Sequence, residues 1–263
     1  MNKKIDTTGY DFNDIKAAHL MPLYEPLFAP LVGRGIKFLE LGVQQGVSLR
    51  FWRDYFENAM IVGLDSNPPI KIDDPNNRIH IYQGYQQDTQ LLDRIAKEQA
   101  PDGFDIVIDD CSHIGRLSRI SFWHLFQNHL KPGGLYAIED WGTGYWSRTK
   151  WSDGESYKAK SHVRYHRKER LIDSFSHWVQ HTFPNFPRLA AIPRRLFISR
   201  VIPSHQHGMV GFIKEIIDAS NQGERAIPRS GTERYRYYGV SQLHIVRWLV
   251  IVEKAAKTLG NTT

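Results

Sequence analysis

The sequence predicts an α/β fold with a mostly parallel sheet, and three observations support this prediction. Through about the first 140 residues, short apolar runs alternate with stretches whose apolar residues have helical spacing. Most of these apolar runs end at a glycine or at an acidic residue. Two further β-rich runs almost touch near the C-terminus. Strands separated by helices form βαβ units, which make the strands parallel and place helices on both faces of the sheet.

Four expected strands of the first part are short apolar runs, as buried parallel strands are: Ile36–Leu41, Met60–Leu64, Phe104–Ile108 and Leu135–Ile138. Arg78–Tyr82 alternates between polar and apolar residues and is expected to be a further strand. Helical spacing between them predicts three helices, which are Val47–Asn58, Thr89–Gln99 and Leu117–Leu130. The sequence Lys131-Pro132-Gly133-Gly134 predicts a turn before the last of these strands.

The C-terminal part completes the predicted sheet. Gly208–Asn221 has apolar residues on one helical face and is expected to be a helix. Ser241–Arg247 and Trp248–Val252 predict a tight hairpin, since two β-rich runs stand almost in contact. An antiparallel last strand on an otherwise parallel sheet is common. The total is seven strands with an antiparallel terminal hairpin.

Composition limits the class of protein. The 263 residues fit one domain, 1–263, with residues 1–35 as an N-terminal helical cap and 141–207 as an insertion that covers the substrate. The single Cys111 allows no internal disulfide, so we expect a cytoplasmic protein. We expect no signal peptide and no membrane span, because no sufficiently long apolar run is present. The net charge of +6 leaves nucleic acid open as a partner.

A glycine-containing turn follows the first predicted strand. Gly42 and Gly46 have a spacing that differs from the GxGxxG of dinucleotide folds, so the turn does not indicate pyrophosphate binding. Glu40, just before it, would repel phosphate but favour an ammonium or sulfonium group. Asp65 ends the second strand, where a carboxylate can accept hydrogen bonds from a ribose diol. The alternative is a structural turn beside a surface acid.

Acidic residues end the fourth and fifth predicted strands. Asp109 and Asp110 follow one, and Glu139 and Asp140 follow the other. Because these strand ends meet at one edge of the sheet, the carboxylates would repel one another without a cation between them. Oxygen ligands favour Mg²⁺. We assign Asp110, Glu139 and Asp140 to the metal, with Asp109 nearer a cofactor, although adjacent acids can exchange such roles.

His113 lies three residues after Asp110 and is the expected catalytic base. A hydroxyl is a poor nucleophile while protonated; a metal lowers its pKa and a nearby imidazole accepts its proton. The alternative is that His113, with Ser112, caps the helix that begins near Gly115.

Glu40, Gly42 and Gly46 resemble the first motif of class I S-adenosylmethionine-dependent methyltransferases, and Asp65 resembles the second. Gln44 stands where most members have glycine. A closer resemblance is to the metal-dependent sugar O-methyltransferases of the macrocin and mycinamicin type. Its residues are Asp6-Thr-Thr-Gly9, His19, Tyr24, Glu40-Leu-Gly-Val43, Ser48-Leu49, Trp52, Tyr55-Phe-Glu-Asn-Ala59, Gly63-Leu-Asp65, Gly84-Tyr-Gln-Gln-Asp88, Asp109-Asp-Cys-Ser-His113, Lys131-Pro-Gly-Gly-Leu-Tyr136, Glu139-Asp140 and Val252-Glu-Lys254.

This resemblance implies a Rossmann-like fold, S-adenosylmethionine and Mg²⁺ as cofactors, His113 as the catalytic base and a homo-oligomer. It further implies that Ser48, Gln86 and Asp88 contribute to the cofactor pocket. Cys111 stands where relatives usually have glycine, which would narrow that loop.

Residues 147–170 are strongly basic, with eight Lys or Arg against three acidic residues, so most of the excess charge lies in this one segment. The aromatic residues nearby that could stack on a sugar or an aglycone are Trp141, Tyr145, Trp146 and Trp151. The alternatives are a solvated segment or an RNA-binding one, but no RNA-binding motif accompanies it.

The expected function is methyl transfer from S-adenosylmethionine to a hydroxyl, on a sugar of a glycosylated secondary metabolite. The same site would also suit a small aromatic diol or a nucleic-acid hydroxyl. A subunit that binds the cofactor without catalysis is the remaining alternative.

Overall fold

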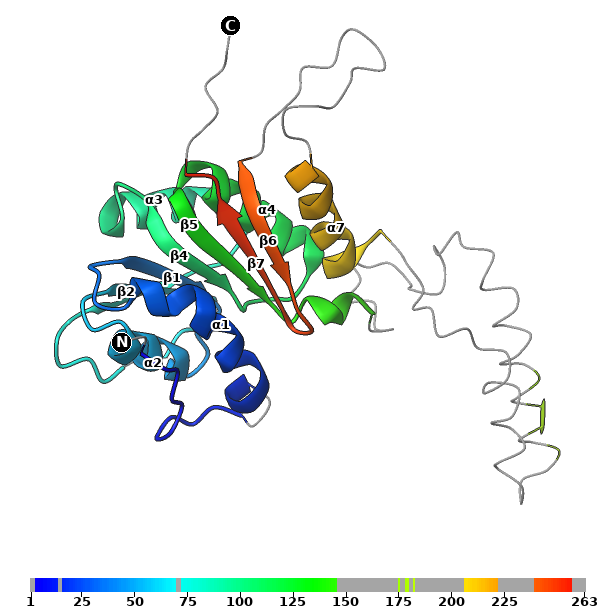
Figure 1. The fold of residues 1–263 in the computed structure, drawn as a ribbon, viewed down its shortest axis with the longest axis horizontal. Helices are drawn as coiled ribbons and strands as arrows, with labels where there is room; N and C mark the ends of the chain where they lie inside the picture. The colour runs from blue at the N-terminus through cyan, green and yellow to red at the C-terminus, as the bar shows by residue number, and fades with distance from the viewer. Residues whose placement is uncertain are drawn as a thin grey trace, which may run out of the picture.

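The computed structural model describes residues 3–13, 16–69, 72–145, 206–221 and 239–256, together with residues 175, 178, 179 and 182. Its centre is a seven-stranded sheet in the order β3-β2-β1-β4-β5-β7-β6 (Figure 1). The strands are β1 Lys37–Leu41, β2 Met60–Asp65, β3 Ile79–Gln83, β4 Phe104–Asp109, β5 Leu130–Glu139, β6 Val240–Ile245 and β7 Leu249–Lys254. The predicted fold class, Rossmann-like with an antiparallel terminal hairpin, is confirmed.

The sheet is parallel except at one side. β1 pairs with both β2 and β4 in parallel, whereas β7 runs antiparallel to β5 and β6. The chain order reverses between β1 and β4, and ligands bind outside the carboxyl ends of strands at such a reversal. Gly42, Asp110 and Asp140 directly follow β1, β4 and β5 at this edge, and Asp109 and Glu139 are the last residues of β4 and β5.

Helices cover both faces of the sheet, because β1, β2 and β4 are buried along almost their whole length. One core cluster joins α3, α4 and α7 to the sheet, and Phe122 and Ile216 are fully buried in it. The other cluster joins α1 and α2 to the opposite face, around Tyr24 and Trp52. Their bounds are α1 Met21–Phe28, α2 Val47–Tyr55, α3 Thr89–Gln99, α4 Gly115–Asn128 and α7 Gly208–Asn221, with short turns η1 Lys16–Leu20, η2 Ala29–Leu31 and η3 Trp141–Tyr145.

The predicted turn at residues 131–134 lies inside β5 instead of before it. Leu130 pairs with Phe104, and pairing with β4 resumes at Leu135, so the register shifts between these points. Gly133 does adopt a turn-like conformation, with a φ of 75°. The backbone on both sides of this bend nevertheless pairs with β4 and belongs to the sheet.

Much of the predicted insertion at 141–207 cannot be compared with the structure. Residues 147–170, Trp146 and Trp151 lie outside the described residues. No helix in the ranges that the structure describes is both long enough and apolar enough to span a bilayer.

Candidate active site

The turn after β1 forms one side of the candidate site. Gly42 has a φ of 90°, and a side chain there would overlap the carbonyl oxygen of Asp110 and lie 2.6 Å from its carbonyl carbon. Glycine is therefore required both by the backbone conformation and by the close approach of the chain after β4. The same approach places Asp110 beside the turn.

A cavity of about 710 Å³ opens along this edge of the sheet. This volume is within the range of small-molecule sites. Six of the residues predicted from the sequence line it: Gly42, Ser48, Asp110, His113, Glu139 and Asp140. The proposed metal ligands, the proposed base and part of the cofactor turn therefore share one cavity.

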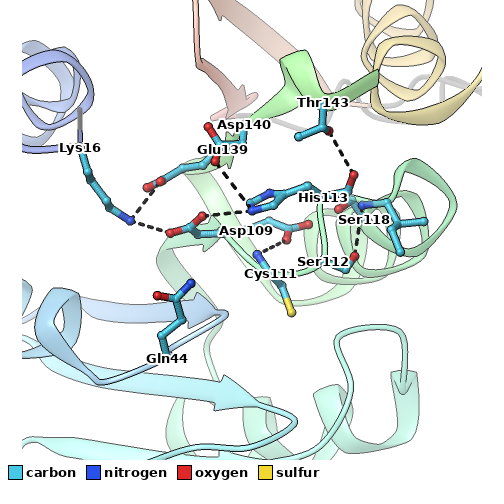
Figure 2. Close-up of polar contacts among 12 residues, drawn as sticks. Lys16, Gln44, Asp109, Cys111, Ser112, His113, Ser118, Glu139, Asp140 and Thr143 are labelled. Atoms are coloured by element: carbon cyan, nitrogen blue, oxygen red, sulfur yellow. Dashed lines mark hydrogen bonds and ion pairs between the residues drawn. The ribbon is translucent and has the colours of Figure 1, made fainter. Parts of the chain in front are cut away.

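A lysine ammonium lies among the proposed metal ligands. Lys16 Nζ is 2.6 Å from Asp110 Oδ2. It is also 3.0 Å from Glu139 Oε2 (Figure 2). The hydroxyl of Tyr24 donates to the other oxygen of Glu139 at 2.7 Å. Lys16 and Tyr24 come from η1 and α1, so the N-terminal region forms one side of the carboxylate cluster.

The electrostatics of the cluster favour a cation. Burial and the charge of Asp110 raise the pKa of Glu139 to about 8, while Lys16 and Tyr24 lower it. Burial also raises the pKa of Asp140. Burial lowers the pKa of Lys16, but the charges of Asp110 and Glu139 outweigh it, and the pKa stays well above its usual value. The carboxylates thus hold a positive charge strongly.

His113 points into the same cluster (Figure 2). Its Nε2 is 3.7 Å from Asp110 Oδ1 and 3.8 Å from Asp140 Oδ2. Its φ of 52° lies in the left-handed region, as does that of Asp140, and such strain is common at functional sites. Thr143 Oγ1 donates to the His113 carbonyl at 3.2 Å and supports this conformation.

The alternative that His113 and Ser112 cap α4 is only partly met. The N-cap position of α4 is Ile114, and no side chain caps it. Ser112 Oγ accepts a hydrogen bond from the backbone of Ile114 instead. The imidazole is thus directed at the carboxylates and not at the helix end.

Asp65 and Glu40 lie beside the turn after β1 but do not line the cavity, so their contact with a cofactor stays a prediction. Asp65 Oδ2 accepts hydrogen bonds from the backbone N–H groups of Val43 and Gln44, at 2.7 and 3.0 Å. Gln44 has a φ of 47°, the left-handed conformation that the usual glycine would adopt more easily. Glu40 is completely buried, which raises its pKa to about 7. Within the described chain neither of its oxygens has a partner in hydrogen-bonding geometry.

Gln86, Asp88 and Asp109 do not line the cavity. Gln86 Nε2 lies 3.2 Å from both oxygens of Asp109, and both side chains are 2% exposed. The side-chain oxygen Oε1 of Gln86 accepts a hydrogen bond from the backbone N–H of Ser112 at 3.1 Å. Asp88 is the N-cap of α3 and accepts from Leu91. These residues hold the backbone around the site, and contact with a cofactor stays a prediction for them, as it does for Gly46.

Trp248 and Lys16 are among the cavity residues that the sequence-based prediction missed. Trp248 lies at the tip of the terminal hairpin, and its carbonyl accepts the backbone N–H of Asp140 at 2.8 Å. An aromatic residue at a hairpin tip was the available signal. Lys16 had no signal, because only the folded chain brings it to residues about a hundred positions away.

Three carboxylates and an imidazole around one cavity are a suitable donor set for a divalent cation. The ligand atoms of Asp110, His113 and Asp140 lie within 4.8 Å of one another. The position of Lys16 shows independently that this point favours positive charge. Glu40 is buried near this cluster, where the charge of Lys16 lowers its pKa and the charge of Asp110 raises it.

No family model matches the chain. The mycinamicin VI 2''-O-methyltransferase of Micromonospora griseorubida is 43% identical over 132 residues, which are 48% of this chain and 32% of that protein. The demethylmacrocin O-methyltransferase of Streptomyces fradiae is 35% identical over 185 residues, which are 64% of this chain and 45% of that protein. The chain is a homologue of sugar O-methyltransferases.

A solved structure supports this homology. The MycE methyltransferase of the mycinamycin pathway, in complex with Mg, SAH and mycinamycin VI, superposes with a TM-score of 0.61 and 30% identity. The superposition covers 91% of this chain and 50% of that one. This homologue of sugar O-methyltransferases therefore spans half or less of the length of the relatives above.

Proposed function

We propose that the chain transfers a methyl group from S-adenosylmethionine to a hydroxyl on a sugar of a glycosylated small molecule, with Mg²⁺ as the metal. The observation that supports this most is the meeting of Asp110, Glu139, Asp140 and His113 in one cavity beside the Gly42 turn. The relatives that match the chain are named as sugar O-methyltransferases.

When bound, S-adenosylmethionine supplies an activated methyl group and Mg²⁺ orients and acidifies the acceptor hydroxyl. Asp110, Glu139 and Asp140 would hold the metal. The Gly42 turn and Ser48 would contact the methionine end, and Asp65 would accept from the ribose diol.

His113 accepts the proton of the acceptor hydroxyl at Nε2. The carboxylates of Asp110 and Asp140, at 3.7 and 3.8 Å, then stabilise the imidazolium that results. Tyr24 positions Glu139 from the other side. Trp248 borders the cavity and offers an apolar face to the acceptor.

The test is an O-methylation assay with labelled S-adenosylmethionine. Mycinamicin VI and demethylated macrocin are suitable first acceptors, because relatives are named for them. A chelator and the substitutions Asp110→Asn and His113→Ala should each reduce turnover, with His80→Ala in β3 as the matched control. Full activity in chelator would remove the metal role, and an unimpaired His113→Ala would remove the base.

The same experiment separates the alternatives. Turnover of a catechol but not of a glycoside would point to a small aromatic diol. Binding of RNA that weakens steeply with salt, together with RNA methylation, would point to a nucleic-acid acceptor. Cofactor binding without turnover on any acceptor would make the chain a non-catalytic subunit.

The proposal includes a single domain, 1–263, whose residues 1–35 form a helical cap and whose residues 141–207 cover the acceptor. The described η1, α1 and η2 support the cap. We further propose a cytoplasmic homo-oligomer, consistent with the single cysteine. Light scattering on the purified chain measures the oligomeric state, and a monomer at micromolar concentration would contradict it.

A further inference from the structure

A second cluster of metal-ligating side chains lies outside the cavity, between α3 and the end of α4. Asp93 comes from α3, His124 from α4, and His129 is the C-cap residue of α4. His124 Nε2 and His129 Nε2 lie 2.7 and 2.6 Å from the same oxygen, Asp93 Oδ1. All three ligand atoms are within 4.8 Å of one another.

The local fold is what brings these groups together. His124 lies in the last turns of α4, and the helix ends before His129, so both imidazoles turn toward α3. Asn128 donates to the carbonyl of His124 at 3.0 Å and holds this end of the helix. The histidine side chains are 19% and 21% exposed, and Asp93 is 55% exposed. The cluster is thus largely preformed yet open to an ion from solvent.

Hydrogen bonding alone accounts for the distances as they stand, because one carboxylate oxygen can accept two N–H groups. The same atoms are also close to the geometry of a metal site. A tetrahedral Zn²⁺ with bonds of about 2.0 Å needs ligand atoms roughly 3.3 Å apart. Opening by well under 1 Å per side chain reaches this spacing, and an exposed carboxylate permits such a movement.

We propose that Asp93, His124 and His129 bind a divalent cation that prefers nitrogen ligands, such as Zn²⁺, with water completing the coordination. Two imidazoles and one carboxylate suit Zn²⁺, Co²⁺, Ni²⁺ or Cu²⁺ and do not suit Mg²⁺, which prefers oxygen. The ion would tie α3 to the C-terminal end of α4. The opposite end of this helix begins two residues after His113. The inference does not rest on the proposed methyl transfer.

The test is calorimetric titration of the chelator-treated full-length chain with Zn²⁺, in excess Mg²⁺. We expect one equivalent of Zn²⁺ to bind at the site formed by Asp93, His124 and His129. His124→Gln or His129→Gln should lower the affinity of this site for Zn²⁺ at least tenfold. His80→Gln, a partly buried histidine of β3, is the matched control and should not change it. Because Asp110, His113 and Asp140 can also take Zn²⁺, Asp110→Asn identifies any equivalent that belongs to the cavity.

Melting temperatures in chelator check that each variant folds, since removing a partly exposed hydrogen bond should change them little. With Zn²⁺ the melting temperature should rise in the wild-type chain and in Asp110→Asn, and rise less in His129→Gln. Zinc binding that is equal in the wild-type chain and in both histidine variants would overturn the proposal. So would a wild-type chain that binds no Zn²⁺ at micromolar concentration.

Discussion

Replacing Lys16 with methionine tests whether its ammonium stabilises the carboxylates of the cavity and competes with a metal ion for them. The substitution keeps a long unbranched side chain and removes the ammonium that lies 2.6 Å from Asp110 and 3.0 Å from Glu139. Lys16 is 14% exposed and Glu139 is 2% exposed, so water cannot replace the lost partner fully. Two carboxylates would then face each other without a cation.

The expected cost follows from this burial. Removing one partner of a buried ion pair destabilises a protein by about 3–5 kcal/mol. The cost should be larger at pH 9 than at pH 6, because Glu139, with a pKa raised to about 8, is mostly protonated at the lower pH. An ion in the cavity must displace Lys16 from the same oxygens. If that displacement costs about 3 kcal/mol, the variant binds Mg²⁺ roughly 100-fold more tightly.

The assay is thermal and urea unfolding with and without Mg²⁺, combined with calorimetric titration. Lys3→Met is the matched control: Lys3 also joins the N-terminal region to the domain, but its pair with Glu57 is 36% and 71% exposed. It should cost less than about 1 kcal/mol and leave Mg²⁺ affinity unchanged. Equal Mg²⁺ affinity in Lys16→Met and in the wild-type chain would refute the competition.

The remaining predictions concern the cofactor turn and the buried carboxyls. Gly42→Ala should lower the free energy of unfolding by about 2–5 kcal/mol, since it adds a backbone clash to the strain of a positive φ. Gly33→Ala is the control: Gly33 has a φ of 82° and no atom within 4 Å of the added carbon, so this variant should show the cost of strain alone. Equal urea midpoints for the two variants would contradict the close approach of Asp110 to Gly42. Glu40 has a pKa raised to about 7, so its contribution to stability is full below pH 4.5 and is lost as pH rises through 7. In chelator, the unfolding free energy of Glu40→Gln relative to that of the wild-type chain should therefore rise by about 3 kcal/mol from pH 4 to pH 8. A stability difference that does not change with pH would argue against a buried ionisable Glu40. Tyr24→Phe should cost about 1.5–3 kcal/mol by removing the hydrogen bond to Glu139, and an unchanged urea midpoint would show that water replaces it.

The fold was predictable because its signals are local. The parallel strands β1, β2 and β4 are buried on both faces, so each appears in the sequence as a short apolar run, whereas β3 at the edge of the sheet is only partly buried. The hairpin was predictable because β6 and β7 are adjacent in the chain. The turn at 131–134 was placed wrongly because glycine and proline indicate a local bend, whereas β5 continues through pairing with a distant strand.

The site was predictable only where it follows strand ends. Asp110, His113, Glu139 and Asp140 stand at the ends of β4 and β5, and the topology brings those ends together. Asp88 has the same kind of side chain, but its position before α3 makes it a helix cap. Lys16 could not be predicted, because its partners are distant in sequence and meet it only through packing of the N-terminal region.

The turn after β1 and the loop after β4 are one unit of backbone, and this explains why glycine stands at position 42. The Asp110 N–H donates to the carbonyl of Leu41 at 2.9 Å, and the Gly42 N–H donates to that of Leu64 at 2.8 Å. The ends of β2, β1 and β4 are thus joined directly, with no side chain between Gly42 and Asp110. A change that moves the turn must also move Asp110. Methyl donor and metal would consequently be held at a fixed separation, as transfer to a metal-bound hydroxyl requires.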